Sequence, residues 1–192
     1  MQQFLESADL LQTVTDETAI INRDAKQLIA GLTKSQLNWK PAPEKWSMAQ
    51  CLEHLAVTNK QDEQRVANAI VRGRHKHPVN GTPAYRPTLM GGWLIKQLLP
   101  TSTRKMPAPK VFRPVESSNI EGALERFLLE QETFLRFVSD ARGIDYNRTR
   151  LRSSVTPLMR FSLADAFVRN VVHCQRHLQQ ARRVRETPGF PK

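Results

Sequence analysis

Three histidines stand at positions from which their side chains could bind one metal ion. His173 and His177 are four residues apart, so on a helix they lie on one face, about 40° apart around the axis. His54 follows the Trp46-Ser47 pair by about two helical turns, on the predicted inner half of another helix. Neutral imidazoles are good ligands for zinc, nickel, copper or iron. The H-x-x-x-H spacing alone is weak evidence, because it occurs by chance and a core histidine can bond a carbonyl instead.

Other residues that could take part in chemistry have competing interpretations. His75 and His77 lie in a basic, irregular run and are expected in solvent. The residues between His173 and His177 lack the glutamate of the H-E-x-x-H signature, which argues against a metallopeptidase. Arg169 and a second arginine, at position 176, could bind an anionic substrate, although a solvated surface position is the favoured interpretation of each.

Four long segments carry apolar residues at helical spacing and are expected to be helices: residues 1–30, 47–71, 118–138 and 162–185. Capping boxes predict the starts of three of them, at Ser47, Ser118 and Ser162. Gly73 is expected to end the second helix. No segment alternates between apolar and polar residues over a useful length, so no strand is predicted.

These segments predict an all-α fold, a four-helix bundle that forms a single domain over residues 1–192. The second and third helices are joined by a long, Pro-rich crossover, residues 72–118, which carries a short extra helix around residues 89–99. A long connection without structure is uncommon in a compact domain unless it has a role, such as covering a site. Sites in such bundles are built from side chains on facing helices.

Two parts of the sequence resemble the DinB-like (DNA-damage-inducible) superfamily. The run N-W-K-P-A-P-E-K-W-S-M-A-Q-C-L-E-H-L, which ends at Leu55, is similar to the entry of its second helix, and V-V-H-C-Q-R-H-L-Q-Q to its last helix. The resemblance implies a four-helix bundle, a homodimer, and a divalent metal ion, zinc or nickel first, held by His54, His173 and His177. The superfamily includes thiol transferases and thiol-dependent isomerases, so the resemblance does not fix the reaction. The basic Pro-rich stretch, residues 72–114, departs from the family pattern and leaves the mouth of the site undefined.

The charge is unevenly distributed along the chain. Residues 1–71 have a net charge of −2 (seven basic, nine acidic) and residues 72–192 of +13 (22 basic, nine acidic), which sum to +11. Clustered basic residues could bind nucleic acid through its phosphates. Arg148, Arg150 and Arg152 alternate along one segment, but no aromatic residues are interleaved with them for stacking on bases. A solvated basic face is therefore favoured over a nucleic-acid site.

The remaining composition bears on location. No apolar run approaches the roughly 18 residues of a membrane span, and the first ten residues carry charges where a signal peptide is apolar. We therefore expect a cytoplasmic protein with no membrane partner. Cys51 and Cys174 are expected to be reduced and buried as small hydrophobic residues.

These observations leave three functional hypotheses. The first is a metal-dependent enzyme with a small-molecule substrate, either a thiol (S-)transferase that uses a low-molecular-weight thiol or a small-molecule hydrolase. The alternative is a non-catalytic basic helical protein associated with nucleic acid or with a stress response. The third is a structural bundle whose histidines bind no metal in cells.

Overall fold

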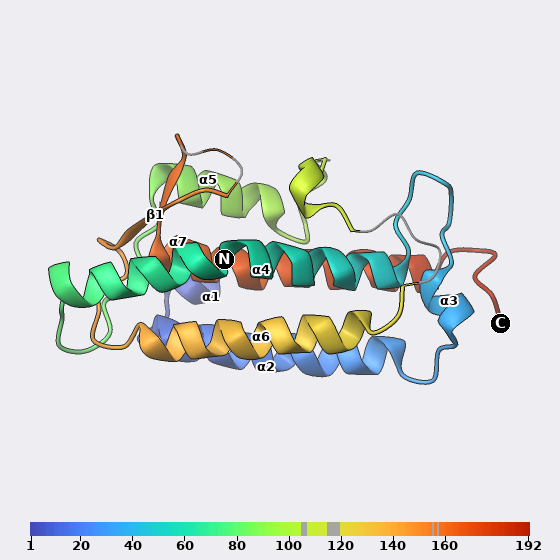
Figure 1. Ribbon diagram of the computed structural model, residues 1–192, viewed down its shortest axis with the longest axis horizontal. Helices are drawn as coiled ribbons and strands as arrows, with labels where there is room; N and C mark the ends of the chain where they lie inside the picture. The colour runs from blue at the N-terminus through green and yellow to red at the C-terminus, as the bar shows by residue number, and fades with distance from the viewer. Residues whose placement is uncertain (105–106, 115–119, 155, 157) are drawn as a thin grey trace.

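Four long helices form two layers in the computed structural model, which describes residues 1–104, 107–114, 120–154, 156 and 158–192. Helices α4 (Met48–Lys76) and α7 (Leu163–Arg185) form one layer, and α2 (Leu10–Ile29) and α6 (Ala123–Asp140) form the other (Figure 1). Helix α4 packs against α6 and α7, and α2 packs against the same two helices. The predicted all-α four-helix bundle is therefore confirmed.

Shorter elements complete the chain: α1 (Gln2–Leu5), α3 (Lys34–Asn38), α5 (Leu89–Leu98), the 3-10 turn η1 (Lys110–Phe112), β1 (Arg150–Arg152) and β2 (Arg160–Ser162). The α5 helix, η1 and the β1–β2 hairpin lie over the α4–α7 layer, on the side away from α2 and α6 (Figure 1). The predicted short helix of the crossover is thus present as α5. No helix in the described part of the chain has the length and apolar character needed to cross a bilayer.

Capping boxes fix the first residues of both helices in the α4–α7 layer. The Ser47 hydroxyl accepts from the Gln50 backbone N–H, and the Gln50 side chain accepts from the Ser47 backbone N–H, each at 3.1 Å. Ser162 and Asp165 make the same reciprocal pair at the start of α7, at 2.9 and 3.0 Å. Both starts agree with the sequence prediction, and they set the positions of every later side chain on these helices.

The other two bundle helices begin later than predicted. Helix α2 starts at Leu10, with the Asp9 side chain as its N-cap, because residues 2–5 form the separate α1. Helix α6 starts at Ala123, while Ser118 lies outside the described residues. Before α6, the Asn38 side chain bonds both the N–H and the carbonyl of Ile120, at 2.8 and 3.1 Å. These two bonds hold the backbone of Ile120 to α3 instead of to a helical turn.

The sequence suggested that Gly73 ends the second bundle helix. This prediction is wrong, because α4 continues to Lys76. An ideal Cβ atom at this position would lie 2.6 Å from Ile144 Cγ2 and 2.8 Å from the Thr149 hydroxyl oxygen. The glycine therefore permits the segment that follows α6 to pack directly against the α4 backbone. Its role is close approach, which periodicity alone does not distinguish from helix termination.

The β1–β2 hairpin was not predicted. Its antiparallel register pairs Leu151 with Phe161 and Arg152 with Arg160. Leu151 is buried while Arg150 and Arg152 are exposed, which is the alternation of a half-buried strand. The alternating arginines in the sequence already showed this pattern, but three residues are too few to infer a strand from periodicity.

The crossover is attached to α7 at two places. Near its start, the hydroxyl groups of Tyr85 and Thr88 donate to the Asp165 carboxylate at 2.9 and 2.7 Å. Beyond α5, the Arg176 guanidinium donates to the carbonyls of Leu99 and Ser102 at 3.0 and 3.2 Å. Arg176 is thus neither a solvated residue nor available for substrate; it holds the crossover against the helix that carries the histidine pair.

The close approach at Gly73 makes a testable prediction. Gly73→Ala gains helix propensity of about 1 kcal/mol, but the added methyl group collides with Ile144, so we expect a net destabilisation of about 1–3 kcal/mol. Chemical denaturation measures the free energy of unfolding. The control is Val71→Ala, at a position of the same helix that is 55% exposed, with an expected change within about 0.5 kcal/mol. A Gly73→Ala variant as stable as the parent would show that the packing is looser than described.

Candidate metal centre

The three predicted histidines meet between α4 and α7. His173 Nε2 lies 3.2 Å from His54 Nε2 and 3.1 Å from His177 Nε2. One potential ligand atom from each ring falls within 4.8 Å of the others, and no other cluster of three His, Cys, Asp or Glu side chains occurs among the described residues. In a tetrahedral zinc site, with zinc–nitrogen distances of about 2.0–2.1 Å, neighbouring nitrogens are about 3.3 Å apart. The three side chains could therefore hold one metal ion.

Hydrogen bonds at the far side of two rings orient the nitrogens toward the centre. His54 Nδ1 lies 2.5 Å from the Phe112 carbonyl oxygen, and His177 Nδ1 lies 3.0 Å from the Gln180 side-chain oxygen. Because both oxygens only accept, each Nδ1 carries the proton and donates it. The Nε2 atoms of His54 and His177 then present lone pairs, which is the tautomer that a metal-binding histidine needs.

Burial and an indole ring shield the cluster. His54 is 4% exposed and His177 is 9% exposed, whereas His173 is partly exposed. The Trp46 ring stacks on His177, with centroids 5.6 Å apart and planes at 28°, and lies 4.8 Å from the His54 ring. Trp46 directly precedes the Ser47 cap, so the start of α4 also forms one wall of the site. His173 is the least buried of the three histidines.

All three imidazoles are held in the neutral form. Burial, and then the neighbouring His54, lower the pKa of His177 to about 3. Burial and then the two adjacent rings depress the pKa of His173 well below its ordinary value. Burial also lowers the pKa of His54, against the bond to Phe112, which raises it. Since only a neutral imidazole can bind a metal ion, the environment favours the form that ligates.

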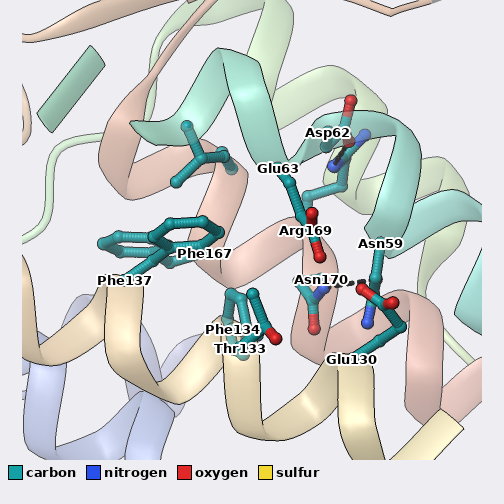
Figure 2. A pocket seen from close by; sticks show the side chains of 12 residues that line it. Asn59, Asp62, Glu63, Glu130, Thr133, Phe134, Phe137, Phe167, Arg169 and Asn170 are labelled. Carbon is teal, nitrogen blue, oxygen red and sulfur yellow. Dashed lines mark hydrogen bonds and ion pairs between the residues drawn. The ribbon is translucent and has the colours of Figure 1, made fainter. Parts of the chain in front are cut away.

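A small cavity with both polar and apolar lining residues lies further along α4, between α4, α6 and α7 (Figure 2). Asn170 donates to Asn59 at 2.7 Å, and Arg169 forms an ion pair with Asp62. The cavity has a volume of about 30 Å³, enough for about one water molecule and too small for an organic substrate. The Arg169 charge is neutralised by Asp62, so this arginine is a structural residue and does not select an anionic substrate.

The remaining candidates lie outside the cluster. Cys51 and Cys174 are free and fully buried, as predicted, and burial raises the pKa of each thiol to about 12. Neither thiol is a nucleophile at neutral pH, because the reactive form is the thiolate. His75 is exposed, His77 is the C-cap of α4, and neither joins the three-histidine cluster.

Sequence reasoning missed three contributors to the site. Gln180 lies three residues after His177, on the same helix face, so the spacing could have identified it. Trp46, which the sequence marked only by its place before the Ser47 cap, stacks on His177 and contacts the His54 ring. The Phe112 contribution is a backbone carbonyl from the Pro-rich crossover, and no residue type marks such a group in a sequence.

The fold and the histidine geometry define the class: a helical bundle in which side chains from two facing helices could hold a metal ion. The sequence model of the DinB superfamily matches residues 20–181, and the chain belongs to this superfamily. The comparison with curated proteins and the comparison with solved structures gave no match. The homodimer and the cytoplasmic location stay predictions.

The lowered pKa values predict that the metal-free protein loses stability in acid. An unfolded histidine titrates near 6.5, so between pH 7 and 5 the unfolded state binds protons that His177 in the folded state does not. The free energy of unfolding therefore decreases as the pH is lowered from 7 to 5, by about 2 kcal/mol for His177 alone. Chemical denaturation of chelator-treated protein at pH 7 and at pH 5 measures this loss of stability. In His177→Leu the loss should be smaller than in the parent by about 2 kcal/mol, and in the control His75→Gln it should be the same as in the parent. A loss in His177→Leu equal to that of the parent would contradict the lowered pKa of His177.

Proposed function

We propose that the protein is a metal-dependent enzyme in which His54, His173 and His177 bind one divalent ion, zinc or nickel. The observation that carries the proposal is the convergence of three Nε2 atoms, two of them in rings whose Nδ1 protons are committed to other acceptors. Catalytic zinc sites have three protein ligands and an open position, whereas structural sites use four. A set of three histidines therefore favours catalysis over a structural metal.

Each residue around the cluster has a part in this proposal. Phe112 and Gln180 orient the imidazoles through their Nδ1 atoms, and Trp46 excludes water from one side. A divalent ion, when bound, supplies a Lewis acid that lowers the pKa of a small molecule at its open position. A substrate would approach from the side of His173, the least buried of the three histidines.

The composition of the cluster favours a thiol over water as the nucleophile. Among the described residues, no carboxylate belongs to the cluster, and Glu53, next to His54 in the sequence, is paired with Arg126 at 2.6 Å. The described residues therefore offer no free carboxylate as a general base. The proton must then leave for solvent, which is easier for a thiol, with an ordinary pKa of about 8.5, than for water at about 15.7. Thiol transfer is therefore the first choice and hydrolysis of a small molecule the second.

The proposed transfer joins a low-molecular-weight thiol to an electrophilic carbon. The thiol proton passes to solvent, the sulfur forms a bond to the carbon, and the leaving group departs with its bonding electrons. None of these steps requires an oxidant or a reductant. The two buried cysteines, whose thiols remain protonated, take no part.

Metal content tests the ligand assignment. We expect about one zinc or nickel ion per chain in protein purified without an affinity tag, by elemental analysis, because three oriented imidazoles bind such ions tightly. His173→Ala should lose at least about nine-tenths of that metal, since one ligand of three is removed. The matched control, His75→Ala, removes an exposed histidine outside the cluster and should retain it. Equal metal content in both variants would refute a three-histidine centre.

Cobalt substitution tests the choice of nucleophile. In cobalt-loaded protein, a small thiol such as 2-mercaptoethanol should produce the near-ultraviolet absorption of a cobalt–thiolate bond, because the open position accepts sulfur. Ethylene glycol, which has no thiol, is the control. Thiol-transfer assays with alkyl halides then compare the parent with His173→Ala, and we expect a loss of at least about 100-fold, of the size seen when catalytic groups are removed. Absence of the band, with hydrolysis of small esters or amides by the same preparation, would favour the hydrolase.

A further inference from the structure

A second groove, separate from the histidine cluster, is lined almost entirely by arginines. Its lining residues are Arg65, Asn68, Arg72, Arg150, Leu151, Arg152 and Arg160, and its volume is about 440 Å³. Helix α4 forms one wall and the β1–β2 hairpin the other, on the side of the bundle where the hairpin lies in Figure 1. The α4 arginines follow His54 by 11 and 18 residues, about 16 and 27 Å along the helix axis. We call this feature the arginine groove.

The arginine groove has a concentrated positive charge. Among the described residues, no carboxylate lines the groove and none of its five arginines forms an ion pair, although Arg65 is close enough to Asp62 to help lower the pKa of that carboxyl. Arg152 and Arg160 are directly opposite each other in the strand register, an arrangement of like charges that destabilises a strand pair. Arg150 lies two residues from Arg152, so it projects from the same face of β1. A bound anion would relieve this repulsion.

Two of the guanidinium groups are fixed in place by backbone carbonyls. Arg72 donates to the Arg150 carbonyl at 3.0 Å, across the groove from α4 to β1, and Arg65 donates to the Gln61 carbonyl at 2.5 Å. A guanidinium has five N–H donors in a planar fork, so one carbonyl bond leaves donors for a phosphate. Fixed guanidinium groups lose less side-chain entropy when a ligand binds.

The lining distinguishes among anionic ligands. Pockets for small organic molecules are mostly apolar, but among the described lining residues the one apolar side chain is Leu151, which is 6% exposed. None of the described lining residues is aromatic, so none could stack on the bases of a single strand. The basic surface continues past the groove at Lys76 and Arg148, both exposed, near the contact between Gly73 and Thr149. These features fit an extended anion that is recognised through its phosphates.

We propose that the arginine groove binds the phosphate backbone of double-stranded nucleic acid without reading its bases. The hairpin arginines and the α4 arginines would contact phosphates from opposite walls, with the affinity supplied by counterion release. Arg150 and Arg152 are exposed, as the sequence favoured, and they share this groove with Arg65 and Arg72. This activity is independent of the metal centre.

Fluorescence anisotropy with a labelled duplex of mixed sequence tests the proposal. The triple variant Arg150→Gln, Arg152→Gln, Arg160→Gln should bind at least about 10-fold more weakly, and the slope of log K against log salt should shrink by about 2.7, or 0.9 for each lost phosphate contact. The control is Arg136→Gln, Arg182→Gln, Arg183→Gln, which removes the same charge from exposed positions outside the groove. The duplex affinity of this control should stay within about 3-fold of that of the parent, because only long-range electrostatic attraction changes.

Two further variants test the opposite wall of the groove and the metal centre separately. Arg65→Gln with Arg72→Gln, on the opposite wall, should reduce the slope by about 1.8 even if the hairpin variant fails to fold. His54→Ala should bind the duplex as the parent does, so loss of the metal centre and loss of the groove are distinguishable. Equal weakening in the groove and control variants would overturn the proposal, as would a parent that fails to bind duplex. A parent that binds inorganic tripolyphosphate at micromolar concentration but not duplex would show a small-anion site instead.

Discussion

The candidate metal centre depends on three neutral imidazole rings being held with one nitrogen of each within 4.8 Å of the others. His173 faces the other two rings at 3.1 and 3.2 Å, and a proton on more than one of these facing nitrogens would place like groups against each other. Burial keeps the rings uncharged, and acceptors at the Nδ1 atoms of His54 and His177 turn their lone pairs inward. A bundle that maintains this arrangement must hold α4 and α7 in a fixed relation.

The rest of the bundle provides that fixed relation. Reciprocal caps define the first turns of α4 and α7, while α2 and α6 cover the opposite side of the layer. The crossover that departs from the family pattern is part of the site, because its Phe112 carbonyl orients His54. Arg176, one residue before His177, holds the same crossover to α7. Arg176, a side chain expected in solvent, therefore helps to position the crossover that orients His54.

The sequence predicted those features that depend on residues close together in the chain. The i, i+4 spacing of His173 and His177 and the two confirmed capping boxes are local, and the histidines meet as expected. Features that depend on distant contacts were missed. Gly73 continues its helix because Ile144 and Thr149 pack on it, and the Phe112 carbonyl reaches His54 across 58 residues of chain. Spacing contains no information about such contacts.

X-ray absorption spectroscopy at the edge of the bound metal, on protein purified without an affinity tag, tests the central claim most directly. We expect a first shell with three nitrogens at about 2.0–2.1 Å for zinc, and the multiple scattering that imidazole rings produce. The imidazole scattering should disappear when His54, His173 and His177 are replaced together. A first shell of oxygen or sulfur without imidazole scattering would contradict the three-histidine centre, because the metal would then be bound elsewhere.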